Sequence, residues 1–253
     1  MNRITLITLG FATAACSSSS KQATPEQYDD TAQAIASTTA TGGGGGDVAS
    51  MTDSVNIALG TPPTGITLSA DGHFQGSRLG VDYSYAITCK NQAGATLTAC
   101  DHTTNQATVD VSWSGSLTSP NLDASVSRDG TWTVTGLQTD TATFSGDSSF
   151  SFDATVRSIF RPGVTATYAF DASASYNAIR IATQARQIID GSASFDLTAH
   201  STVTGAGSGN ADASFDVHAQ ITFHADHTAS LVLDGSRRYS IDLTTGAVVH
   251  ANS

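Results

Sequence analysis

A long stretch near the end of the chain alternates strictly between apolar and polar residues, and no other feature limits the fold as much. The apolar positions are Ala211, Ala213, Phe215, Val217, Ala219, Ile221, Phe223 and Ala225, and polar residues stand between them. Successive side chains of a β-strand point to opposite faces, so this period of two predicts a long strand with one apolar face. The other face, made of Asp, Ser, His, Gln and Thr, is typical of a sheet surface in water.

The same period recurs from Gly65 to the end of the chain. It appears at Val109, Val111, Trp113; at Phe150, Phe152, Ala154, Val156; at Val164, Ala166, Tyr168, Phe170; and at Phe195, Leu197, Ala199. Asp-Gly pairs favour hairpin turns, and such pairs stand at Asp71-Gly72, Asp129-Gly130, Asp190-Gly191 and Asp234-Gly235. We therefore expect a mainly β domain over residues 61–253, with about a dozen antiparallel strands in up-and-down order.

This large sheet is expected to form a sandwich or an open barrel. A transmembrane barrel would show similar alternation. The apolar face is rich in alanine and carries no aromatic girdles, which favours a domain tethered at a membrane surface.

A first helix is expected ahead of the sheet. Thr24 fits the N-cap, Pro25 fits the first helical position, and Gln27 fits the capping-box partner, so a helix should run to about Thr38. Five consecutive glycines at 42–46 then predict a flexible joint. Because the first helix offers few large apolar residues, we expect it to be a weakly docked spacer.

A second helix should follow the glycines, so that residues 25–60 hold two helical segments. Asp47 is expected to cap it, and Gly60 and Pro62 should end it. Its apolar stripe comprises Val48, Met51, Val55 and Leu59. Spacings of three and four place these residues on one face, which should pack on the sheet.

Charge excludes some partners. Only 13% of the 253 residues are charged, and the formal net charge is −11. Nucleic acids and anionic lipid headgroups both attract basic patches, so neither is expected to bind directly.

The beginning of the chain is expected to be a targeting segment. A short basic start at Met1 to Arg3 precedes an apolar stretch over 4–12, which is too short to cross a bilayer as a helix of about 20 residues. Small residues then lead to Cys16, and serines occupy 17–20. An ordinary signal peptide cleaved after Ala14 is one interpretation.

The order Thr13, Ala14, Ala15, Cys16 also resembles the lipobox of bacterial lipoproteins. This resemblance implies a signal peptide over 1–16, a lipid attached to Cys16, a serine-rich tether over 17–24 and the membrane as a partner through the anchor. Ser17, rather than aspartate, implies the outer membrane, on its periplasmic or its outer side.

If Cys16 is acylated, Cys89 and Cys100 remain as a pair. A polar turn with a glycine lies between them, so the two cysteines could face each other across a hairpin. An oxidising compartment then favours a disulfide over two buried free thiols.

The histidines suggest one polar patch on the sheet. A hairpin centred on Gly207 would place Asp196 opposite His218 and His200 opposite Ser214. The candidate patch comprises Asp196, His200, Asp216, His218 and His224. Such a patch could be pH-sensitive or bind a metal weakly, although any half-exposed sheet presents similar residues.

The apolar face suggests a second candidate site. A curved sheet must fill this face with its own side chains, with the helix over 48–59, or with a bound lipid. The candidate lining comprises Phe150, Phe170, Phe195, Phe215 and Phe223. Such an open barrel is similar, in architecture only, to periplasmic lipoprotein carriers.

No catalytic motif was found: the sequence holds no Gly-x-Ser-x-Gly, His-Glu-x-x-His or Walker-type loop. No cofactor and no metal are therefore expected, and an enzyme is unsupported. The sequence favours a lipoprotein with a structural or interaction role in the cell envelope. The alternative is a carrier of an apolar, lipid-like ligand.

Overall fold

The computed structural model describes residues 21–41, 46–78, 80–205 and 211–251. The lipobox, most of the glycine joint and the loop around Gly207 lie outside the described residues. The strands are β1 (Lys21–Gln22), β2 (Ile66–Leu68), β3 (Phe74–Arg78), β4 (Val81–Lys90), β5 (Gln106–Ser119), β6 (Leu122–Thr135), β7 (Thr141–Arg157), β8 (Val164–Ala182), β9 (Ile188–Gly205), β10 (Ala211–Phe223), β11 (Thr228–Leu233), β12 (Arg237–Asp242) and β13 (Val248–His250).

All of these strands belong to one 13-stranded sheet. From β2 at one edge to β13 at the other, every strand pairs with its neighbours in the sequence, and the pairing is antiparallel throughout. Only β1 departs from this order, because it pairs in parallel with β10. The prediction of a mainly β fold with up-and-down antiparallel strands is confirmed.

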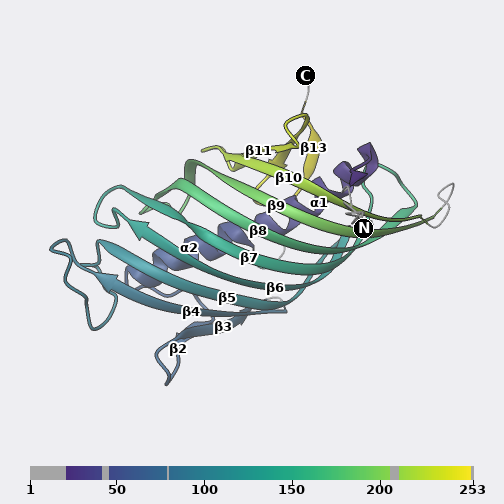
Figure 1. Ribbon diagram of the computed structural model, residues 1–253. Helices are drawn as coiled ribbons and strands as arrows, with labels where there is room; N and C mark the ends of the chain where they lie inside the picture. Colours follow the sequence, from purple (N-terminus) through teal and green to yellow (C-terminus); the bar gives the residue numbers. More distant parts are fainter. Residues whose placement is uncertain (1–20, 42–45, 79, 206–210, 252–253) are drawn as a thin grey trace, which may run out of the picture.

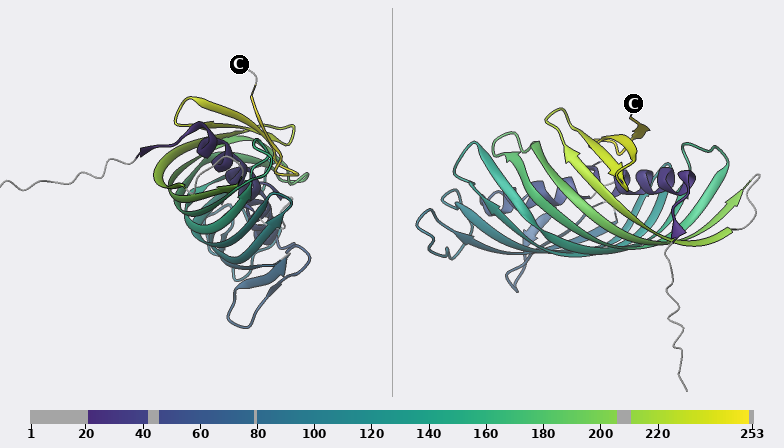
Figure 2. Two further views of the ribbon diagram at one scale, coloured as in Figure 1. Left: turned by 90° about the vertical axis from the view of Figure 1, so that its right-hand side faces the viewer. Right: turned by 45° about the horizontal axis from the view of Figure 1, so that its top comes forward.

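The sheet curves into an open trough, and its two edges do not pair with each other. Helices α1 (Pro25–Thr39) and α2 (Asp47–Ala58) lie inside this trough, against its concave face (Figures 1 and 2). Of the two forms expected, the structure is therefore the open barrel, with one sheet and not a sandwich.

The core lies between the concave face and the helices. Its side chains come from alternate positions of the strands and from both helices, and they form one continuous apolar cluster. The largest fully buried side chains include Trp132, Tyr85, Phe144, Phe170, Phe195, Phe215, Phe223 and Met51. Helices and sheet thus share a single core, because neither could bury its apolar face alone.

The capping box of α1 is confirmed: the Thr24 N–H donates to Gln27 Oε1 at 2.8 Å, and the Gln27 N–H donates to Thr24 Oγ1 at 3.3 Å. The expectation of a weakly docked spacer is wrong, because eleven of the 15 residues of α1 are buried. Polar contacts hold it in place. The Gln33 amide donates to the carbonyls of Asn121 and Arg157, at 2.9 and 3.1 Å.

Helix α2 packs on the sheet as expected, with Met51 and Val55 fully buried and with Val48 and Leu59 partly buried at the edge of the core. The expected cap is wrong: Gly46 is the N-cap residue, without a side-chain bond, and Asp47 is the first residue of the helix. Asp47 instead forms an ion pair with Arg128 of β6. A buried guanidinium needs a charged partner, and this need decides where the carboxylate points.

Two of the four Asp-Gly pairs, Asp71-Gly72 and Asp234-Gly235, lie in turns, but Asp129-Gly130 and Asp190-Gly191 lie inside β6 and β9. The prediction of turns at those two pairs is wrong. A Cβ at Gly130 would lie 2.7 Å from the Cβ of Ser148 on the next strand. A Cβ at Gly191 would lie 2.4 Å from the Cα of Ile179, where the pairing of β8 and β9 is irregular. These glycines allow close contact between strands.

Cys89 and Cys100 are joined in a disulfide, which confirms their predicted pairing. The bond fastens the end of β4 to the loop that leads into β5. Neither described helix is long and apolar enough to cross a membrane.

Candidate functional site

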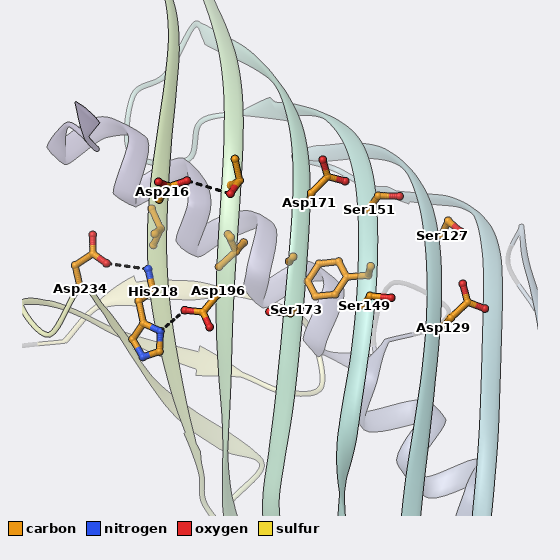
Figure 3. A pocket seen from close by; sticks show the side chains of 15 residues that line it. Ser127, Asp129, Ser149, Ser151, Asp171, Ser173, Asp196, Asp216, His218 and Asp234 are labelled. Carbon is orange, nitrogen blue, oxygen red and sulfur yellow. Dashed lines mark hydrogen bonds and ion pairs between the residues drawn. The ribbon is translucent and has the colours of Figure 1, made fainter. Parts of the chain in front are cut away.

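The convex face of the sheet, opposite the helices, carries a shallow depression of about 770 Å³, which we call the outer hollow. Its walls come from β6 to β10 and from the turn after β11, and their polar side chains point away from the helices (Figure 3). The polar lining comprises Ser127, Asp129, Ser149, Ser151, Asp171, Ser173, Asp196, Thr198, Asp216, His218 and Asp234.

The outer hollow results from the alternation of apolar and polar residues along the strands. Each strand turns every second side chain outward, and small serines on β7 and β8 leave room between the larger residues. Five of the lining residues are aspartates, one is histidine, and none is Lys or Arg. The outer hollow is therefore an acidic surface that can accept hydrogen bonds.

The predicted register of β9 and β10 is confirmed. Asp196 pairs with His218 and His200 pairs with Ser214. Nδ1 of His218 lies 2.7 Å from Oδ1 of Asp196, and Nδ1 of His200 lies 3.1 Å from Oγ of Ser214. Because 45% of the His218 side chain and 76% of the Asp196 side chain are exposed, this pair contributes little to stability.

The predicted polar patch is divided in the structure. Asp196, Asp216 and His218 line the outer hollow, whereas His200 and His224 lie outside its lining. His224 contacts Ser230, with Nε2 2.9 Å from Oγ. Within the described ranges, no group of three or more His, Cys, Asp or Glu could hold a metal ion.

Asp234 joins the outer hollow to the helices and was missed by sequence reasoning. Its carboxylate accepts the backbone N–H of His218 at 2.8 Å and the Tyr28 hydroxyl of α1 at 2.6 Å. The Asp234-Gly235 turn was the available signal, but a turn motif does not reveal a contact with a distant helix.

Inside the trough, three aspartates of the helices each contact one tyrosine of the sheet and one arginine, which comes from β3, from β6 or, for Arg161, from the loop between β7 and β8. We call these groups the anchor clusters: Asp30 with Arg161 and Tyr168, Asp47 with Arg128 and Tyr176, and Asp53 with Arg78 and Tyr85. The tyrosine hydroxyls donate to the carboxylates at 2.9, 2.8 and 3.1 Å, in that order. Together the clusters fasten both helices to the sheet by charge and by hydrogen bonds.

Burial controls the electrostatics of the anchor clusters. It raises the pKa of all three carboxyl groups, because a buried carboxylate loses its hydration. It lowers the pKa of Arg128 for the same reason. The Cζ of Arg128 lies between 5.4 and 5.8 Å from the ring centroids of Trp113, Trp132, Phe150 and Tyr176. In this aromatic cage, each charge of the Arg128–Asp47 pair depends on the other.

The predicted apolar lining belongs mostly to the core. Phe170, Phe195, Phe215 and Phe223 are at most 2% exposed, and Phe150 is half-buried at the edge of the outer hollow. In the described part of the trough, helices and packed side chains occupy the place that a ligand would need.

Comparison of the chain with protein-family models, with curated proteins and with solved structures finds no match.

Proposed function

We propose that this chain is a lipid-anchored protein of the cell envelope with a structural or interaction role, and that it contacts its partner through the outer hollow. One observation carries the proposal: the apolar trough is filled by the chain's own helices. The anchor at Cys16 and the outer membrane as its address rest on the lipobox resemblance.

The anchor clusters support permanent occupancy of the trough. The side chains of Asp30, Asp47 and Asp53 are at most 5% exposed. If a helix left the trough, the arginines would lose their counter-charges, and breaking one fully buried ion pair costs about 3–5 kcal/mol. A carrier that stores a lipid along the Phe-lined face would have to open these clusters, so we place the interaction role first.

The chemistry of the outer hollow indicates the kind of partner. Its carboxylates and hydroxyls face water, and its lining contains no Lys or Arg. Complementary charge speeds encounter and selects among partners. We therefore expect a protein partner with basic side chains at the contact.

Site-specific photo-cross-linking in living cells tests this proposal. The full-length protein would carry benzoylphenylalanine in place of Ser173, at the centre of the outer hollow, or in place of Ala93, an exposed residue of the β4–β5 loop. We expect a discrete cross-linked product at position 173 only. We also expect its yield to fall when Asp171→Asn and Asp216→Asn are combined. Identical products at both positions, or no product at any position of the hollow, would contradict the proposal.

A further inference from the structure

A second depression, of about 940 Å³, lies beside α2, and we call it the trough mouth. Its walls come from α2, the end of β3 and the turns that follow β8, β10 and β12. Residues that matter here are Val48, Thr52, Arg78, Arg186, Ile188 and Leu243. The volume lies in the range of small-molecule sites, about 300–1,000 Å³.

The trough mouth borders the side of α2 that the sheet does not cover. Val48 and Thr52, one helical turn apart, are half-buried, whereas Met51 and Val55 face the core. Ile188, the first residue of β9, and Leu243, in the turn after β12, belong to the core, and their edges line the depression. One wall of the depression can therefore hold an alkyl chain.

Two guanidinium groups give the depression a positively charged side. Arg78 and Arg186 line the depression, and its only described carboxylate, Asp53, already binds Arg78 and Tyr85. With His227 counted as neutral, two arginines and one aspartate give the lining a net charge of +1, in a chain whose net charge is −11. The trough mouth is therefore positively charged, whereas the outer hollow is acidic.

Arg186 is held in position, and no carboxylate of the described residues is paired with it. Its Nε donates to Oδ1 of Asn56 on α2 at 2.6 Å, while its Nη1 is buried and has no hydrogen-bond partner among the described residues. The turn that carries it is fixed, because Thr183 Oγ1 donates to the Thr139 carbonyl at 2.7 Å and the Gln187 amide donates to the Ala225 carbonyl. The Arg186 side chain as a whole is only half-buried and lines the depression, so its positive charge is open to a ligand from that side.

We propose that the trough mouth binds an amphiphilic carboxylate such as a fatty acid, with the carboxylate on Arg186 and the alkyl chain along Val48, Ile188 and Leu243. A carboxylate in the depression would supply the counter-charge that Arg186 lacks among the described residues, and charge-assisted bonds of this kind are the stronger ones. This site is separate from the outer hollow, so the inference goes beyond the proposed function. It leaves the helices in the trough.

The test is photo-labelling of the full-length protein in cells with a decanoic acid that carries a diazirine near the end of its chain. Labelled peptides are identified by mass spectrometry. The matching decanol probe, with the same chain and no charge, measures binding by the tail alone. We expect the acid to label peptides containing residues 48–52 or 185–188, and the alcohol to label them about tenfold less.

Substitutions of arginine test where the carboxylate of the probe binds. Arg186→Gln should lower labelling by the acid about tenfold, Arg186→Lys should retain part of it, and Arg157→Gln, on the exposed surface, should leave it unchanged. An intact Cys89–Cys100 disulfide and unchanged protease resistance check that each variant is folded. Equal labelling by acid and alcohol, label spread evenly over the surface, or no effect of a folded Arg186→Gln would overturn the proposal. The comparison of acid with alcohol needs no variant, so a misfolded one does not prevent the test.

Discussion

The ion pair between Asp47 of α2 and Arg128 of β6 should be among the strongest local contributions to stability. Only 3% of the Asp47 side chain and 2% of the Arg128 side chain are exposed. Arg128 also donates to Oγ of Ser148 at 2.7 Å, and Tyr176 donates to Asp47 at 2.8 Å. In Arg128→Met the carboxylate would remain buried beside an apolar side chain, so we expect a loss of about 3–5 kcal/mol in the free energy of unfolding.

A double variant separates the loss of the pair from the penalty of one unpaired charge. In Asp47→Leu with Arg128→Met, no uncompensated charge remains, so this protein should be more stable than Arg128→Met alone. Urea unfolding of the purified protein, followed by tryptophan fluorescence, measures all variants, because both Trp113 and Trp132 lie near Arg128. A loss below about 1 kcal/mol in Arg128→Met, or a double variant no more stable than it, would refute the reasoning.

Arg157→Met provides the matched control. Arg157 pairs with Asp123 on the outer surface, where 52% and 43% of the two side chains are exposed. This change should cost at most about 1 kcal/mol. A cost as large as that of Arg128→Met would mean that burial does not determine the effect.

Three further predictions concern pH, the disulfide and the anchor. Burial raises the pKa of Asp30 above its ordinary value of 3.8, so above that pH the folded chain binds more protons than the unfolded chain. The stability of the wild type relative to Asp30→Asn should therefore fall as pH rises from about 4 to about 7. Urea unfolding of both proteins at both pH values measures the difference between their free energies of unfolding, and this difference should shift against the wild type at the higher pH. Replacing Cys89 and Cys100 with serine should remove about 3 kcal/mol, and two alkylatable thiols in the denatured, unreduced wild type would show that the bond is not formed. Cys16→Ser should abolish labelling by an alkyne fatty acid, whereas persistent label would contradict acylation at Cys16.

Local sequence patterns were enough to predict an antiparallel sheet, the up-and-down order of its strands and part of their register. The alternation of β10 and the position of its hairpin placed Asp196 opposite His218, as the structure does. The capping box of α1 was equally readable, since its groups lie within four residues. The roles of Gly130 and Gly191 could not be predicted from the sequence, because these roles depend on neighbouring strands and not on the Asp-Gly pair itself.

Contacts between distant segments account for what the sequence did not reveal. Asp47 fits a cap by its place in the sequence, but its partner comes from β6. The trough mouth joins turns after three different strands to α2, so no spacing along the chain indicates it. For the outer hollow, alternation gave Asp196, Asp216 and His218, whereas Asp234 required the packing of α1.

Hydrogen exchange of backbone amides in α1 and α2 would test most directly whether the chain fills its own trough. Because the anchor clusters fix both helices in the core, we expect their central amides to exchange as slowly as those of β7 and β8, through global unfolding. Helix amides that exchange orders of magnitude faster than these strands would contradict permanent occupancy, and would show that the trough opens while the sheet stays folded.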